Sequence, residues 1–156
     1  MNSAELVAQL LARGQLVATA ESCTGGMVAA AITDIAGSSA VFDRGFVTYS
    51  NAAKTQMLGV PVRLIEAHGA VSEAVAKAMA EGALAHSAAT LSVAITGIAG
   101  PTGGSETKPV GLVHFACAMK SGKLWHLREV FQGDRAAIRA AARGQALQML
   151  RNALAG

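Results

Sequence analysis

The stretch LVATAESCTGG, residues 16–26, joins a short apolar run to a cluster of hydroxyl, thiol and glycine residues. Residues 16–20 have the length and apolar character of a buried strand, and the small residues after Gly26 continue as a helix that Gly37 can end. A strand that turns through glycine into a helix is the unit from which α/β proteins are built, and these folds bind ligands at the carboxyl ends of their strands. The stretch therefore predicts both a fold class and the place of a site.

The rest of the chain continues this alternation. Helix caps are expected at Ser3, Asn51, Ser72 and Asp134. Further strands are expected at residues 42–50, 91–96, 110–119 and 123–131, and KSGK makes the last two a hairpin. This order predicts an α/β fold, namely a three-layer α/β/α sandwich with a mixed, mostly parallel sheet of about five strands, antiparallel only at the hairpin.

The composition indicates a single folded domain over residues 1–156. Hydrophobic residues make up 52% of the chain and charged residues 15%, a balance that supports a buried core and excludes disorder. The formal net charge of +3 is dispersed and aromatic residues are only 4%, so nucleic acid is not an expected partner. The amino terminus lacks the pattern of a secretory signal and no apolar run is long enough to span a bilayer, so no membrane partner is expected either.

The two cysteines indicate neither a disulfide framework nor a metal site. Cys23 and Cys117 are far apart in the sequence, and neither has Cys or His neighbours at metal-ligand spacing. A reducing cytoplasm is the expected compartment. We expect activity without a metal or another cofactor, and an alanine-rich helical surface favours self-association into a homo-oligomer.

Three adjacent side chains in the opening stretch are candidate nucleophiles, namely Ser22, Cys23 and Thr24. Gly25 and Gly26 would let a ligand approach backbone amides at the start of the helix. Residue types alone favour a plain helix cap followed by a tight turn, because caps far outnumber nucleophiles. A serine nucleophile also needs a base, yet the four histidines fall at expected helix ends or in the hairpin, and no Gly-x-Ser-x-Gly motif is present.

A lysine after the second strand is an alternative base. In VTYSNAAK, residues 47–54, Ser50 and Lys54 are four positions apart and would share one face of a short helix. Burial or a nearby positive charge can lower the pKa of a lysine far enough for it to accept a proton. An isolated lysine is more often solvated, so this stretch alone favours a surface lysine without a catalytic role.

The loop GIAGPTGGSETKP, residues 97–109, is a second glycine-rich segment. Its amides and hydroxyls can cradle a phosphate, but it matches neither the Walker pattern nor the dinucleotide fingerprint, and a plain connection is equally compatible. The candidate binding residues around it are Thr96, Gly97, Gly100, Gly103, Gly104 and Ser105.

Three arginines, Arg135, Arg139 and Arg143, recur every four residues along the last helix. Such a stripe is typical of a solvated face. Arg135 is the expected exception because it lies in the first turn of that helix, at the edge of an element.

Together, the motifs AESCTGG, GFVTYSNAAK, GAVSE, ITGIAGPTGGSETKPVG and GDR resemble the carboxy-terminal domain of the CinA (competence and damage inducible) family, the nicotinamide mononucleotide deamidases. The resemblance runs from residue 16 to residue 135 without a departure from these motifs. It implies hydrolysis of the carboxamide of nicotinamide mononucleotide to nicotinate mononucleotide and ammonia, in pyridine nucleotide recycling, by a Ser/Lys pair. The matching serine is Ser22 and the matching lysine is Lys54, while Tyr49 and Arg135 match further site positions.

The implied chemistry assigns roles to the glycine segments. Amides of residues 23–25 would hold the oxyanion, and the 97–109 loop with a basic side chain would hold the phosphate. The pyridinium cation of the substrate would help keep Lys54 neutral. Two alternatives stay open, a non-catalytic nucleotide-binding or protein-interaction module on the same fold, and a cysteine amidase using Cys23, although no neighbouring histidine would produce its thiolate.

Overall fold

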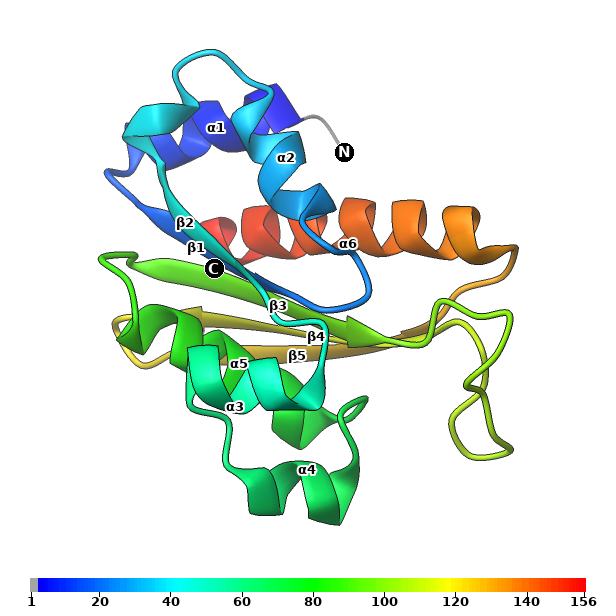
Figure 1. Ribbon diagram of the computed structural model, residues 1–156. Coiled ribbons are helices and arrows are strands. Elements are labelled where there is room, and N and C mark those ends of the chain that lie inside the picture. The colour runs from blue at the N-terminus through cyan, green and yellow to red at the C-terminus, as the bar shows by residue number, and fades with distance from the viewer. Residues whose placement is uncertain (1–2) are drawn as a thin grey trace.

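The computed structural model describes residues 3–156, and in this range one five-stranded sheet lies between two layers of helices (Figure 1). The strands are β1 (Val17–Glu21), β2 (Phe42–Val47), β3 (Leu91–Gly97), β4 (Leu112–Met119) and β5 (Leu124–Val130). The helices are α1 (Ser3–Ala12), α2 (Met27–Thr33), the 3-10 turn η1 (Ser38–Ala40), α3 (Asn51–Leu58), α4 (Val62–His68), α5 (Glu73–Ala85) and α6 (Arg135–Ala155). The expected α/β/α sandwich is confirmed, with α1, α2 and α6 on one face of the sheet and α3, α4 and α5 on the other.

The sheet is mixed, in the order β2-β1-β3-β4-β5. Strand β1 runs parallel to both β2 and β3, whereas β3 pairs with β4, and β4 with β5, in antiparallel register. The expectation that only the hairpin would be antiparallel was therefore wrong. Parallel neighbours need a crossover connection, usually a helix, but residues 98–111 form a loop without one, so β4 returns directly beside β3.

Helix caps set where the helices begin. Ser72 and Asp134 accept hydrogen bonds from the amides of Val75 and Ala137, so both expected caps are confirmed. At α3 the cap is Ser50, whose side chain accepts from the amide of Ala53, and not the expected Asn51. Ser50 is the residue with extended backbone, which an N-cap requires, whereas Asn51 already lies in the helix.

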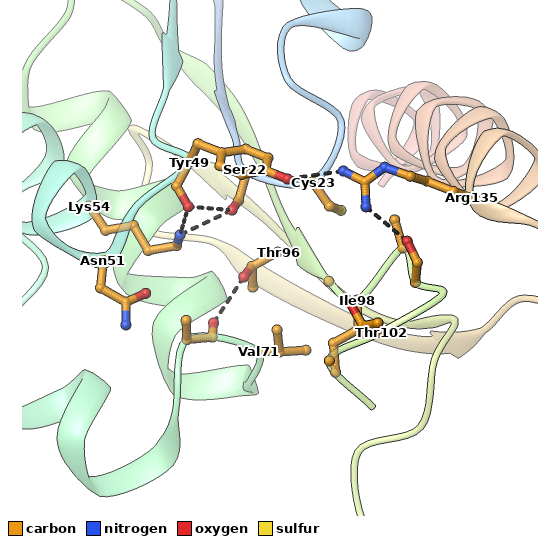
Figure 2. Close-up of a pocket in the computed structure, with 15 residues that line it drawn as sticks. Ser22, Cys23, Tyr49, Asn51, Lys54, Val71, Thr96, Ile98, Thr102 and Arg135 are labelled. Atoms are coloured by element: carbon orange, nitrogen blue, oxygen red, sulfur yellow. Dashed lines mark hydrogen bonds between the residues drawn. The ribbon is translucent and has the colours of Figure 1, made fainter. Parts of the chain in front are cut away.

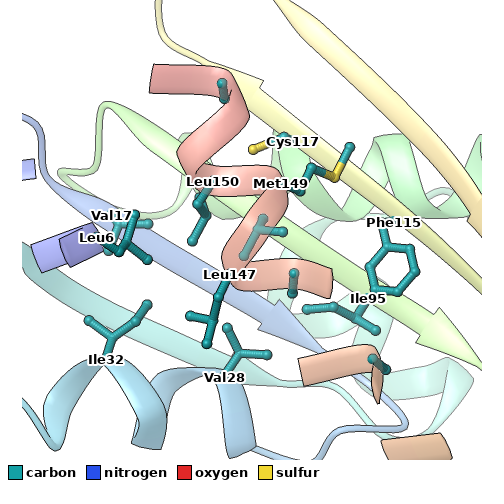
Figure 3. Close-up of a cluster of buried hydrophobic side chains, with 14 of the residues drawn as sticks. Leu6, Val17, Val28, Ile32, Ile95, Phe115, Cys117, Leu147, Met149 and Leu150 are labelled. Carbon is teal, nitrogen blue, oxygen red and sulfur yellow. The ribbon is translucent and has the colours of Figure 1, made fainter. Parts of the chain in front are cut away.

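The two faces of the sheet carry different cores. On the α6 face, aliphatic and aromatic side chains interlock, among them Leu6, Ile32, Phe115 and Leu150 (Figure 3). On the α5 face the strands contribute mainly alanine, with Met79 and Leu58 filling the space between helices. Small residues bring α5 close to the sheet, and so place the segment before α5 at the sheet edge. No helix among residues 3–156 has the length and apolarity needed to cross a bilayer.

Candidate active site

The carboxyl ends of the three parallel strands meet at one edge of the sheet, and an open cavity of about 280 Å³ lies there (Figure 2). Segments after β1, β2 and β3, the turn before α5 and the start of α6 all reach it. Its lining residues are Ser22, Cys23, Tyr49, Asn51, Lys54, Ala70, Val71, Thr96, Gly97, Ile98, Ala99, Gly100, Thr102, Gly103 and Arg135. Ligands of open α/β sheets bind at such an edge, so this cavity is the candidate site.

A lysine and a serine from separate elements meet in the cavity. Lys54, in the second turn of α3, places its Nζ 3.0 Å from the Oγ of Ser22, which directly follows β1 (Figure 2). The same Nζ lies 3.0 Å from the carbonyl oxygen of Thr48 and 3.3 Å from that of Tyr49. Ser22 is 8% exposed and Lys54 only 1%, so the pair is shielded from bulk water.

These three neighbours of Lys54 are all uncharged, and they can satisfy a neutral amine as well as an ammonium. A neutral lysine has two N–H donors and one lone pair. The two carbonyl oxygens of Thr48 and Tyr49 can only accept, whereas the Ser22 hydroxyl can donate to the lone pair. Burial lowers the pKa of Lys54 below its ordinary value, because desolvation disfavours the ammonium form. The arrangement can therefore draw a proton from Ser22.

The start of α2 is not available to an anion, contrary to the expectation from the glycine turn. The fully buried carboxylate of Glu21 accepts hydrogen bonds from the amides of Val28 and Ala29, at 2.9 and 3.0 Å, and from the Thr24 hydroxyl at 2.6 Å. A carboxylate satisfies both the unpaired amides and the positive end of the helix. No role was expected for Glu21, which directly follows the expected strand at residues 16–20, and only its acidic side chain could have indicated this contact.

The turn that follows Ser22 keeps part of its amides free. The amide of Gly25 donates to the carbonyl of Ser22 at 3.1 Å, so the expectation that it binds an oxyanion was wrong. Within residues 3–156 the amides of Cys23, Thr24 and Gly26 donate to no other residue, although the Cys23 amide contacts its own side-chain sulfur. The amides of Cys23 and Thr24 directly follow Ser22, so they are the backbone donors beside the candidate nucleophile.

Two arginines of α6 reach the site. Arg135 donates from Nη1 to the carbonyl of Gly100 at 2.9 Å and from Nη2 to the Tyr49 hydroxyl at 3.0 Å, and so spans the cavity opposite Lys54 (Figure 2). Arg139 donates from Nε to the carbonyl of Cys23 at 3.0 Å. The expectation of a solvated face for Arg139 was therefore wrong, because the turn after β1 packs against this side of α6.

Five of the expected binding residues lie outside the cavity lining, namely Thr24, Gly25, Gly26, Gly104 and Ser105. The Thr24 side chain is buried against Glu21 on the other face of the sheet. The Ser105 hydroxyl accepts from the amide of Lys108 and closes a turn within the loop. Thr96, Gly97, Gly100 and Gly103 line the cavity, together with Asn51, Val71, Ile98 and Thr102, which were not among the predicted binding residues.

The cysteine beside Ser22 is in its thiol form at neutral pH. Burial raises the pKa of Cys23 to about 11, which leaves very little thiolate. No histidine lines the cavity, and His114 and His126 instead pair with each other, Nδ1 to Nε2, at 2.8 Å. Within the part of the chain that the structure describes, no group of three His, Cys, Asp or Glu side chains is placed to hold a metal ion.

The fold and the site together define an α/β protein with a buried serine and lysine pair at the carboxyl edge of its parallel strands. The chain belongs to the CinA C-terminal domain family, whose model matches residues 2–154. The nicotinamide-nucleotide amidohydrolase PncC of Escherichia coli (strain K12) is 59% identical over 151 residues, which span 96% of this chain and 92% of that protein.

Other relatives are longer or are known as structures. A CinA-like protein of Anaeromyxobacter dehalogenans (strain 2CP-C) is 56% identical over 96% of this chain, which spans 36% of that protein. The crystal structure of the competence/damage inducible protein CihA from Agrobacterium tumefaciens has a TM-score of 0.93 and 49% identity, and covers 100% of this chain and 97% of its own. The crystal structure of the competence damage-inducible protein A (ComA) from Klebsiella pneumoniae has a TM-score of 0.93 and 41% identity. It covers 99% of this chain and 98% of its own.

Proposed function

We propose that this chain is an amidohydrolase that converts nicotinamide mononucleotide to nicotinate mononucleotide and ammonia, in pyridine nucleotide recycling. The observation that carries the proposal is the 3.0 Å contact between the Lys54 Nζ and the Ser22 Oγ inside the cavity. The 59% identity to a protein named nicotinamide-nucleotide amidohydrolase supports the substrate. Ser22 acts as nucleophile and Lys54 as general base and acid.

In the first half of the reaction the carboxamide acylates the serine. Lys54 accepts the Ser22 proton while Oγ forms a bond to the carboxamide carbon. The tetrahedral intermediate then loses its C–N bond, and the Lys54 ammonium returns the proton to the leaving nitrogen, which departs as ammonia. In the second half, Lys54 takes a proton from water, hydroxide attacks the ester, and Ser22 leaves with the proton from Lys54.

The substrate's own charge favours this chemistry. A pyridinium ring withdraws electrons from the carboxamide and makes its carbon more electrophilic. Its positive charge also disfavours an ammonium nearby, so bound substrate adds to the burial that keeps Lys54 neutral. The amides of Cys23 and Thr24 are the proposed donors to the oxyanion.

The nucleotide's phosphate belongs, in this proposal, at the Arg135 side of the cavity. Arg135 is the cationic side chain, other than Lys54, in the cavity lining, and Gly100, Thr102 and Gly103 lie on the same side. Tyr49 accepts from Arg135 through its hydroxyl, and its carbonyl oxygen accepts from the Ser22 hydroxyl at 3.5 Å. The cytoplasmic location and the homo-oligomeric state stay predictions.

Ammonia release from nicotinamide mononucleotide by the purified protein tests the proposal. We expect Ser22→Ala to lower turnover by more than about 10³-fold, because the nucleophile of a covalent mechanism is lost. Lys54→Met should do nearly the same, because removing either member of a unit that acts together costs as much as removing both. Cys23→Ser serves as the matched neighbour and should retain turnover.

Three outcomes separate the alternatives. Turnover that survives in Ser22→Ala points to another nucleophile or a contaminating enzyme. Turnover that is lost in Cys23→Ser but kept in Ser22→Ala supports the cysteine amidase. Binding of nicotinamide mononucleotide to the wild type without ammonia release supports a non-catalytic nucleotide-binding module.

A further inference from the structure

The turn after Ser22 is anchored through its carbonyl groups to a side chain of α6. Arg139 donates from Nε to the carbonyl of Cys23 at 3.0 Å and from Nη2 towards the carbonyl of Thr24 at 3.4 Å. The guanidinium also packs on Gly25, where an added Cβ would lie 3.4 Å from Nη2. Arg139 is half-buried, and it joins residues that are 116 positions apart in the sequence.

This anchor determines where an amide points. In a trans peptide the N–H is directed opposite to the C=O of the same unit. The Cys23 carbonyl is held towards α6, so the N–H of Thr24 is directed away from α6. Ala18 and Ala20 of β1 face the α5 side, and Ser22 continues that alternation and meets Lys54 there. The Thr24 amide is thus directed towards the layer that holds the serine and lysine pair.

A second anchor holds the same residue from its side chain. The Thr24 hydroxyl donates to the buried carboxylate of Glu21 at 2.6 Å, and Glu21 also accepts from the amides of Val28 and Ala29 in α2. Between them, Glu21 and Arg139 satisfy the polar groups of the turn that face away from the cavity. The amides of Cys23 and Thr24 donate to no other residue within residues 3–156, although both residues are buried.

We propose that Arg139 is a positioning residue for the reaction, which holds the carbonyls of Cys23 and Thr24 so that the Thr24 amide stays directed at the developing oxyanion. The inference rests on the proposed function for its substrate. The positive charge on the carbonyl side also polarises the peptide unit and strengthens its N–H as a donor. Arg139 itself touches neither substrate nor the reacting atoms.

Steady-state kinetics of Arg139→Ala with nicotinamide mononucleotide test the inference. Loss of one whole oxyanion donor lowers kcat by about 10²–10³-fold, and loss of its support should cost less, on the order of 10-fold to 10²-fold. KM should stay within about twofold, because the amide binds the transition state more strongly than the ground state. Arg139→Lys keeps the charge and a single donating nitrogen, and should recover part of kcat.

Arg143→Ala is the matched control, since Arg143 lies one turn further along α6 and makes no hydrogen bond to residues 22–26 in the described chain. It should keep wild-type kcat. Thermal unfolding of each variant separates loss of function from loss of fold, and Arg139→Gln replaces Arg139→Ala if the latter does not fold. A KM that rises as much as kcat falls, or a kcat within twofold of the wild type, overturns the inference.

A fluorophosphonate probe makes the test independent of the substrate. Ser22 Oγ forms a bond to phosphorus, fluoride leaves, and the serine proton passes to Lys54, while the phosphoryl oxygen takes the oxyanion position. We expect labelling of Ser22 to slow at least 10-fold in Arg139→Ala and to be unchanged in Arg143→Ala. Equal labelling rates, or a wild type that is not labelled at Ser22, overturn the inference. Normal labelling of the wild type without ammonia release contradicts the proposed function alone.

Discussion

At the scale of single residues, the unusual feature is a lysine that is 1% exposed with no carboxylate partner in the described structure. Its neighbours are two carbonyl oxygens and a hydroxyl, a set without the negative charge that would stabilise an ammonium. A buried ammonium without a counter-ion is costly, so burial shifts the protonation equilibrium of Lys54 towards the neutral amine. The pKa of Lys54 is accordingly below its ordinary value of 10.5, and activity should follow it.

The first prediction concerns pH. Neutral Lys54 is the active form, so kcat/KM should rise with pH through the lowered pKa of Lys54, with a slope of one on the acid side. This rise in kcat/KM should occur below pH 10.5, and it should be absent from the residual activity of Lys54→Met. A pH profile from 5 to 10 measures it, and a rise that persists unchanged in Lys54→Met would contradict the assignment.

The same shift predicts how stability depends on pH. The folded pKa lies below the unfolded one, so between the two the unfolded chain binds more protons and stability rises with pH. The destabilising contribution of Lys54 is complete below the folded pKa and disappears above 10.5. Urea unfolding should therefore show Lys54→Met more stable than wild type at pH 7, and a smaller difference at pH 10. A difference that grows with pH would show the opposite shift.

At the scale of elements, the position of α3 depends on one glycine of α5. A Cβ added at Gly82 would lie 2.1 Å from the carbonyl oxygen of Leu58, the last residue of α3. The two helices approach closely because Gly82 has no side chain. This contact fixes the helix that carries Lys54 against the layer that α5 forms on the sheet.

Gly82→Ala should therefore lower the free energy of unfolding by about 1–3 kcal/mol through overpacking. It should also reduce kcat, because a shift of α3 moves Lys54 away from Ser22. Gly144→Ala on α6 is the control, since an added Cβ there meets nothing within 4 Å, and it should stabilise the protein by about 0.5–1 kcal/mol. Urea unfolding measures both variants, and equal stability of the two would contradict the role of Gly82.

At the scale of the whole molecule, the sheet separates an aliphatic core from an alanine-rich one. Neighbouring residues of β4 face the two cores in turn, with Ala116 towards α5 and Cys117 towards α6. The alanine-rich side keeps α5 close and brings its preceding residues, Ala70 and Val71, into the cavity lining. Small side chains in the second core are thus part of how the site is assembled.

Ala116→Leu should destabilise the protein by about 1–3 kcal/mol, because the α5 side has no room for a larger residue. Cys117→Val, on the same strand but the other face, nearly conserves volume and should cost less than about 1.5 kcal/mol. Thermal or urea unfolding gives both values. If Ala116→Leu is tolerated as well as Cys117→Val, the α5 layer is not closely packed.

The sequence by itself determined the features that depend on short-range patterns. The apolar run before Ser22, the caps at Ser72 and Asp134, and the alternation of strands with helices follow from local backbone and side-chain preferences. The candidate pair of Ser22 and Lys54 came from a likeness of motifs, because no local pattern shows that residues 32 positions apart meet.

The tertiary structure alone decided what depends on packing between distant segments. The direction of β4 followed from a connection without a crossover helix. Glu21 accepts hydrogen bonds from the amides at the start of α2 that the glycine turn was expected to leave free, because a buried carboxylate needs donors. Arg139 does not lie on the solvated face that was expected, because the turn after Ser22 packs against α6 and accepts its hydrogen bond. In each case the free energy of a polar group depends on which neighbours the fold brings to it, and short-range sequence preferences do not contain that information.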